Sequence, residues 1–280
     1  MREPAVAGMF YPGTDRTLRK ELKECFMRGP GRDSPLKGPR ITGIISPHAG
    51  YTYSGATAAR GFMAMADGGM PETVVVVGPN HHGIGSPVAV SGEDFKLPMG
   101  TMTNDIELGK ALDLPFDDRS HRREHSMEVQ LPFVQYLSKD TKQVCISMLD
   151  QSLRAARDIG EHIARAVKDT GRNTAIVGSS DFTHCGWNYG FPVPGGMNAG
   201  EFARSLDMPV IERLLEMDLQ GAFSRKRELG TTACGLGPIA AMMEASMKIG
   251  ARSASLLGYT TSYDVMPADS AVGYASVIVL

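Results

Sequence analysis

The chain has 280 residues, of which 42% are hydrophobic and 21% are charged, and its formal net charge at pH 7 is -2. These values are ordinary for a globular protein, and they lack the basic excess that is typical of nucleic-acid-binding proteins. No apolar run reaches the ~20 residues of a membrane-spanning helix, and the N-terminal residues lack the basic and apolar regions of a signal peptide. We therefore expect a cytoplasmic protein with no nucleic-acid or membrane partner.

No stretch of the chain resembles a linker between two domains. There is no Ser/Gly-rich tract, no block of like charge and no repeat of fixed period. The densest Gly/Pro region, Gly190–Gly200, is too short to separate two hydrophobic cores. We expect residues 1–280 to form a single domain.

Helical and extended patterns alternate along the chain. Leu18, Leu22 and Phe26 recur every four positions and predict a helix over Arg16–Met27. Four consecutive valines, Val74–Val77, suit a strand buried on both faces, because β-branched residues resist helix formation and pack well in sheets.

The remaining elements follow from the same patterns. Further strands are expected over residues 41–46, 87–90, 144–149, 174–178, 255–259 and 272–280. Further helices are expected over 54–67, with Ser54 as its cap, and over 104–112, 127–137, 153–167, 199–217 and 235–249. This alternation predicts an α/β fold of three layers, with a mostly parallel or mixed central sheet covered by helices on both faces.

Histidines follow three of the predicted strands at the point where each strand ends. They are His48 after the first strand, His81 and His82 after the valine strand, and His184, with Asp181, after the strand at 174–178. In open α/β sheets, ligands bind at the carboxyl ends of the strands, where side chains far apart in sequence converge. A lone histidine carries little information, but three such groups together predict a functional site at this edge.

The four cysteines are scattered and form no CxxC pair, and in a cytosolic chain we expect them to be mostly reduced. Cys234 differs from the others because it directly precedes a predicted apolar helix. The positive end of a helix lowers the pKa of a nearby thiol and favours the thiolate, which is the form that binds metals. The alternative is a buried, inert thiol that packs the start of the helix.

A further polar cluster spans residues 121–128. His125 and Glu128 are three residues apart, so on a helix they would share one face and could supply two metal ligands. An ion pair or a helix start capped by Ser126 is the alternative, with Glu128 in the first turn. We expect His82, His125 and Glu128 to support the metal ligands by hydrogen bonding rather than to bind the metal.

Six segments of the chain resemble the motifs of the Memo-like family. They are AVAGMFYP at 5–12, PHAGY at 47–51, GPNHH at 78–82, EHSMEVQLP at 124–132, SSDFTH at 179–184 and TACG at 232–235. They occur in order over nearly the whole chain, which makes the series far more specific than any single motif. The family is similar in fold to the class III extradiol dioxygenases, which use non-haem Fe(II) to open catechol rings.

The resemblance implies a role for each of the strand-end residues. His48 and His81 would be two metal ligands, and Cys234 would stand where the dioxygenases have a glutamate ligand. His184 would match the catalytic histidine opposite the metal, with Asp181 beside it. The Memo-like family is associated with metal binding and redox roles, and in animals with cell-motility signalling.

A thiolate in place of the carboxylate changes the chemistry of the site. Two histidines and a carboxylate are the Fe(II)-binding triad of non-haem oxygenases, whereas a thiolate makes the site softer. Fe(II) remains the expected metal, and Cu(I) and Zn(II) become competitors. Because O₂ chemistry can oxidise a thiolate, the ring-cleaving activity of the dioxygenases is not expected to carry over.

Three hypotheses for the function follow, in order of preference. The first is a redox-active metalloenzyme in which His184 acts as general acid or base. The second is a module that binds a peptide or small molecule in a pocket with a vestigial dioxygenase-type site. The third is a zinc hydrolase, because two histidines, one cysteine and a water form a known catalytic zinc pattern, with His184 or Asp181 assisting attack.

Overall fold

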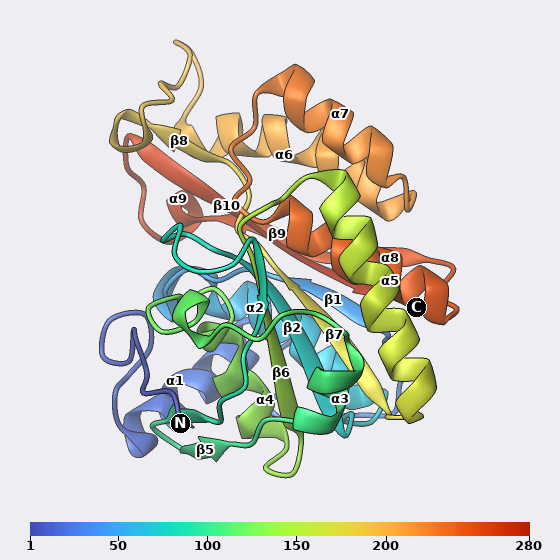
Figure 1. Cartoon of the computed structure of the whole chain (residues 1–280). Coiled ribbons are helices and arrows are strands. Elements are labelled where there is room, and N and C mark those ends of the chain that lie inside the picture. The colour runs from blue at the N-terminus through green and yellow to red at the C-terminus, as the bar shows by residue number, and fades with distance from the viewer.

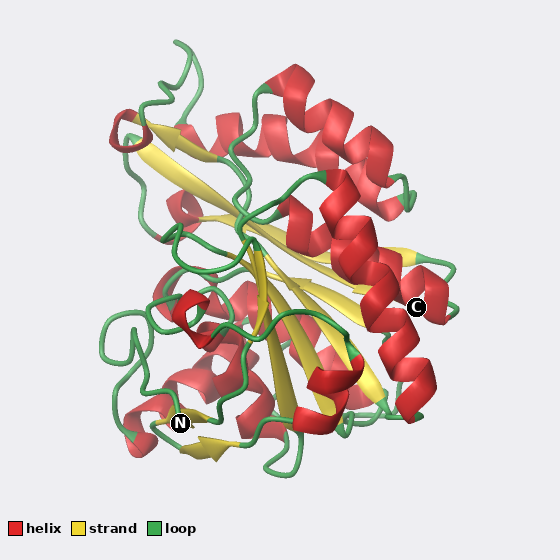
Figure 2. Ribbon diagram, viewed as in Figure 1, coloured by secondary structure: helices red, strands yellow, loops and turns green.

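A mixed sheet of eight strands runs through the computed structural model, which describes residues 1–280 (Figure 1 and Figure 2). From one edge to the other the strands are β3 (Val88–Val90), β6 (Lys142–Met148), β2 (Thr73–Pro79), β7 (Thr174–Ser179), β1 (Gly43–Ser46), β10 (Ser270–Val279) and β8 (His184–Gly186), with β9 (Ala254–Thr261) also paired to β10. The four strands β6, β2, β7 and β1 are parallel, whereas β3, β10, β8 and β9 pair antiparallel to their neighbours.

Helices cover both faces of this sheet, which confirms the predicted α/β architecture. One face packs against α1 (Asp15–Arg28), α2 (Tyr51–Asp67) and α4 (Leu131–Leu137). The other packs against α3 (Ile106–Ala111), α5 (Leu153–Thr170), α6 (Ala199–Leu215), α7 (Leu219–Leu229) and α8 (Leu236–Ile249). Smaller elements are the hairpin of β4 (Phe95–Leu97) and β5 (Gly100–Met102), the short helix α9 (Ser262–Val265), and 3₁₀ turns at Asp118–Ser120, Glu128–Gln130 and Trp187–Tyr189.

Consecutive residues of the central strands contribute to opposite cores. Val75 and Val77 belong to the core beneath α5 and α8, whereas Val74 and Val76 belong to the core beneath α1 and α2. This alternation follows from the two-residue period of a strand. All four valines are fully buried, as the run of β-branched residues predicted.

The carboxyl ends of β1, β7 and β2 lie side by side. In the register of the sheet, Ser46 of β1 pairs with Ser179 of β7, and Val77 of β2 pairs with Gly178 of β7. The loops that follow the three strands therefore begin at the same edge, and this edge holds the predicted histidines.

Two helix starts differ from the prediction. Helix α2 begins at Tyr51 after Gly50, and the Ser54 hydroxyl donates to the Ala49 carbonyl, so Ser54 is not its cap. The Ser126 hydroxyl donates to the carbonyl of Pro79 and caps no helix either. Helix α7 was not predicted.

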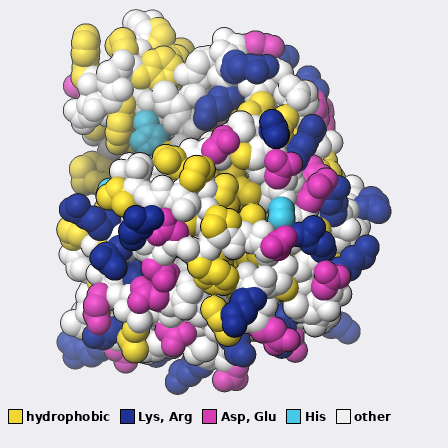
Figure 3. Space-filling view, in the orientation of Figure 1, with side chains coloured by type: hydrophobic (Ala, Val, Ile, Leu, Met, Phe, Trp, Pro, Cys, Tyr) yellow, Lys and Arg dark blue, Asp and Glu magenta, His cyan; other side chains and the backbone are white.

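None of the helices combines the length and the apolar character that a membrane crossing requires. Acidic and basic side chains are interspersed over the face drawn in Figure 3. None of the four cysteines forms a disulfide with another in the structure.

Candidate metal centre

Three imidazoles meet at the carboxyl edge of the sheet. His48 follows β1, His81 follows β2, and His125 lies in the loop before the Glu128–Gln130 turn. Their ligand nitrogens lie within 4.8 Å of one another, and we call these three residues the inner group. The rings of His81 and His125 are nearly parallel at 4.7 Å, and His48 stands edge-on to both, at 5.2 and 5.5 Å. An arrangement of this kind could hold a metal ion.

Hydrogen bonds fix the tautomer of His48, which is buried. The Ser179 hydroxyl at the end of β7 donates to the Ser126 carbonyl at 2.6 Å and accepts from the Gln130 amide at 2.9 Å. Its remaining lone pair can only accept from His48 Nδ1, which lies 2.9 Å away. The proton of His48 is therefore on Nδ1, and Nε2 presents a free lone pair.

A buried carboxylate orients His81 in the same way. Glu124 accepts from His81 Nδ1 at 2.9 Å and from the backbone N–H groups of His81, His125 and Ser126 at 2.6, 2.9 and 2.8 Å. Burial on its own would raise the pKa of Glu124, but the hydrogen bonds and the facing His81 hold this pKa well below its usual range. Because a carboxylate only accepts, His81 donates from Nδ1 and leaves Nε2 free for a metal.

Cys234 lies beside His48 but is not part of the inner group. Its Sγ is 3.1 Å from His48 Nε2, and its backbone N–H donates to the Asp181 carbonyl at 3.2 Å. Gly235 follows, and its N–H donates to the Ser180 hydroxyl at 2.9 Å. The predicted ligands Cys234, His48 and His81 therefore lie at one edge of the sheet, and His125, which was not predicted as a ligand, lies there as well.

The expectation that a helix lowers the pKa of Cys234 is wrong. Burial of the thiol, followed by the nearby Asp181 carboxyl, raises this pKa well above its usual value. Helix α8 begins only at Leu236, and the cost of burying a thiolate outweighs the favourable end of the helix. Thiolate at this position therefore needs a cation to stabilise it.

The two predicted catalytic residues flank the inner group. The Asp181 carboxyl accepts from the His48 backbone N–H at 2.7 Å, and burial raises its pKa to about 7. His184 Nδ1 donates to the Phe182 carbonyl at 2.9 Å, and its backbone N–H donates to the Thr232 hydroxyl at 2.7 Å. Burial lowers the pKa of His184, so the imidazole is neutral at pH 7 with a free lone pair on Nε2.

A cavity of about 340 Å³ opens beside these two residues. Its walls hold no Lys or Arg and consist of Ala49, Tyr53, Asp181, His184, Asn188, Tyr189, Ser262, Met266, Ala268, Ser270, Val272 and Tyr274. None of the inner group lines it, but Asp181 connects its wall to the inner group by accepting from the backbone N–H of His48. The volume is at the lower end of the range for small-molecule sites.

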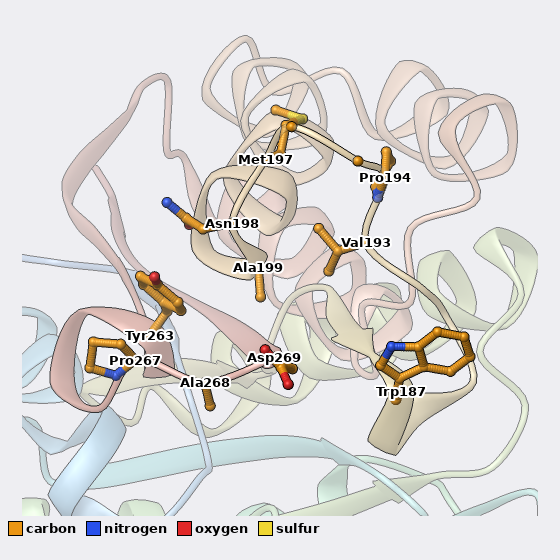
Figure 4. Close-up of a pocket in the computed structure, with 12 residues that line it drawn as sticks. Trp187, Val193, Pro194, Met197, Asn198, Ala199, Tyr263, Pro267, Ala268 and Asp269 are labelled. Atoms are coloured by element: carbon orange, nitrogen blue, oxygen red, sulfur yellow. The ribbon is translucent and has the colours of Figure 1, made fainter.

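A larger cavity, of about 510 Å³, shares Ala268 with the smaller one as a lining residue. Figure 4 shows Trp187 at one side of it, Tyr263 and Pro267 at the other, and Met197 on the loop above. Its lining contains no histidine or cysteine. We therefore place the functional site at the smaller cavity, which is lined by Asp181 and His184, the two predicted catalytic residues.

The three predicted support residues have different surroundings. His125 belongs to the inner group, while exposed His82 donates from Nε2 to the Arg123 carbonyl at 2.9 Å. The hydrogen bonds of Glu128 come from the N-terminal segment, including a buried ion pair with Arg2. The shared helix face of His125 and Glu128 does not form, because His125 precedes the 3₁₀ turn.

Sequence reasoning missed the residues that orient the ligands. They are Glu124, Ser179 and Gln130, which belong to the quoted motifs but were given no role. Glu124 was recognisable only as a carboxylate next to a histidine, and nothing in the sequence distinguished Ser179 from other strand-end serines.

Comparisons with known proteins agree with the motif pattern. The family model that describes Memo-like proteins matches residues 2–278. A MEMO1 family protein of Thermococcus onnurineus is 41% identical over 293 residues, covering 99% of both chains. MEMO1 family proteins of Methanococcoides burtonii and Methanosarcina mazei are 40% and 39% identical over 285 and 286 residues, covering 100% of this chain and 100% and 99% of their own.

Proposed function

The chain belongs to the Memo-like family, and from this premise we propose that it is a redox-active metalloprotein with one transition-metal ion at the inner group. His48 and His81 would supply two imidazole ligands and Cys234 a thiolate. We propose Fe(II) as the metal, with Cu(I) and Zn(II) as competitors for the same donors. The bound ion would supply electron transfer to a small molecule in the adjoining cavity.

The observation that carries the proposal is the fixed orientation of the two imidazoles. Ser179 holds the proton of His48 on Nδ1, and Glu124 does the same for His81. Metal-binding histidines commonly donate their other N–H to a hydroxyl, carbonyl or carboxylate in this manner. Both Nε2 lone pairs are therefore available, within a group whose ligand atoms lie within 4.8 Å of one another.

The third ligand is the softer part of the donor set. Cys234 Sγ lies 3.1 Å from His48 Nε2, close to the separation of two donors that share one ion at bond lengths of about 2.0–2.3 Å. Binding a metal would displace the thiol proton, and this offsets the burial that raises the thiol pKa. His125 is the alternative third ligand, because its ring lies within reach of both other imidazoles.

His184 and Asp181 would handle protons at the cavity. His184 is neutral at pH 7 and lines the cavity, so it can accept a proton from a bound molecule. Asp181 lines the same cavity and holds the His48 backbone in place. Because no Lys or Arg faces the cavity, the bound molecule is expected to carry no strong negative charge.

The test is the metal content and absorption spectrum of protein purified without oxygen. Stoichiometric iron or copper in the wild type, lost in Cys234→Ser, supports the redox site and its thiolate ligand. Cys185→Ser is the matched control, because that buried thiol donates only to the Ala199 carbonyl and a serine can replace it.

Two other outcomes would redirect the interpretation. Stoichiometric, colourless zinc would move a zinc hydrolase to first place, with a zinc-bound water as the nucleophile. No metal in any variant, even after reconstitution, would overturn the proposal. The aromatic cavity would then favour a module that binds a small molecule or peptide.

A further inference from the structure

We propose that His82, Glu124 and His125 form an outer metal position, through which a divalent cation reaches the inner group. The ligand atoms of these three residues also lie within 4.8 Å of one another, and we call them the outer group. His125 belongs to both groups. An ion held by the outer group would therefore exchange His82 and Glu124 for His48 and His81, with His125 as the residue that the two groups share, and Cys234 would complete the inner site.

The outer group is held in place before any ion arrives. The Asn80 side-chain oxygen accepts from the N–H groups of His82 and Gly83 at 3.1 and 3.0 Å, which fixes the turn after β2. His82 donates from Nε2 to the Arg123 carbonyl, so Nδ1 keeps the lone pair that a metal requires. This pre-organisation lowers the entropic cost of binding a cation at the turn.

Burial increases along the route from the outer to the inner group. His82 is exposed, the side chains of His81 and His125 are 30% and 19% exposed, and His48 is 2% exposed. A hydrated cation can lose its waters in steps along such a gradient instead of entering a buried site in one step. The buried carboxylate of Glu124 lies beside both groups, so its negative charge offsets the charge of the cation at either position.

The donor set defines the kind of ion. Two imidazoles and one carboxylate suit divalent first-row cations such as Fe(II), Co(II) and Zn(II). The outer group lacks sulfur, so it is harder than an inner group completed by Cys234. A divalent ion should therefore bind weakly outside and more tightly inside, which gives the transfer its direction.

The test is the rate at which Co(II) enters the metal-free protein, followed by absorption in a stopped-flow instrument without oxygen. His82→Ala should slow loading on the order of tenfold and leave the final amount of bound Co(II) unchanged. His162→Ala is the matched control, because His162 on α5 contacts the Leu112 carbonyl rather than either group. Equal loading rates in His82→Ala and His162→Ala would overturn the outer position.

An equilibrium measurement separates this inference from the proposed function on which it rests. His48→Gln should lose tight Co(II) binding and keep a weaker site, and adding His82→Ala should abolish that site. If His48→Gln alone binds Co(II) as tightly as the wild type, the inner site fails. If His48→Gln and the double variant show the same weak binding, the outer position fails while the inner site stands. Far-UV circular dichroism establishes that each variant is folded.

Discussion

Replacing Glu128 with glutamine should strongly destabilise the protein, because its carboxylate anchors the N-terminal segment. Its oxygens accept from Arg2 Nη1 at 2.5 Å, the Ala5 N–H at 2.7 Å, the Val6 N–H at 3.1 Å and the Tyr11 hydroxyl at 2.6 Å. The side chains of Arg2 and Glu128 are only 2% and 0% exposed. The variant keeps the size of the side chain and removes its charge.

Two estimates of the cost agree. Removing one partner of a buried ion pair costs about 3–5 kcal/mol, because the other charge stays buried without its counter-ion. Glutamine has one oxygen, so it can satisfy at most two of the four donors. Losing two hydrogen bonds to a charged acceptor costs about 3–6 kcal/mol. We expect the free energy of unfolding to fall by about 4 kcal/mol.

Urea unfolding followed by far-UV circular dichroism measures this loss. Trp187 is 80% exposed, so its fluorescence would report poorly on unfolding. Glu228→Gln is the control, because Glu228 pairs with Arg225 on the surface of α7 and its loss should cost less than about 1 kcal/mol. A loss below about 1 kcal/mol in Glu128→Gln would refute the reasoning, because the buried arginine would then have found another partner.

Three further predictions test other parts of the structure. Burial lowers the pKa of His121 to about 4, whereas the pKa of histidine in an unfolded chain is ~6.5. Because the unfolded chain takes up this proton first, the free energy of unfolding should fall by on the order of 3 kcal/mol as the pH drops from about 6.5 to 4. His121→Gln should flatten that part of the acid-unfolding curve, and an unchanged slope would contradict this assignment. Ser179→Ala should weaken metal binding about 10–100-fold in an anaerobic titration by releasing the His48 ring, whereas Ser147→Ala, which removes a buried hydroxyl without a partner, should not. Gly235→Ala would place a Cβ 2.4 Å from the Ser179 carbonyl oxygen, which is too close for an unchanged backbone. The substitution should therefore lower the urea midpoint of unfolding and make Cys234 more reactive to thiol reagents. A variant with the wild-type midpoint and the wild-type reactivity would contradict the close packing at Gly235.

Elements with a strong local pattern could be predicted from the sequence. The valine run became β2, and the amphipathic pattern at 153–167 became α5. Helix α7 was missed because only Leu219 and Ala222 of it are buried, which leaves a weak apolar stripe. Ser54 was predicted to cap a helix, but its hydroxyl donates to the backbone carbonyl of Ala49 instead. Serine side chains form both kinds of local hydrogen bond, so the residue type alone could not distinguish them.

The candidate site was only partly predictable, because its contacts join distant parts of the chain. Strand ends correctly indicated that His48 and His81 converge. The spacing of His125 and Glu128 was read as helical, but Glu128 pairs with a residue 126 positions away. No local pattern encodes such a partner, and none encodes the burial that raises the pKa of Cys234.

The position of β10 has a consequence for the order of events during synthesis. This strand consists of residues 270–279, yet it lies inside the sheet, because it pairs with β1, β8 and β9 (Figure 1). Until these residues leave the ribosome, β1 has a bare edge next to the loop of His48. His48, His81 and His125 therefore emerge long before the sheet that aligns them is complete, and the nascent chain must remain soluble with an unpaired central edge.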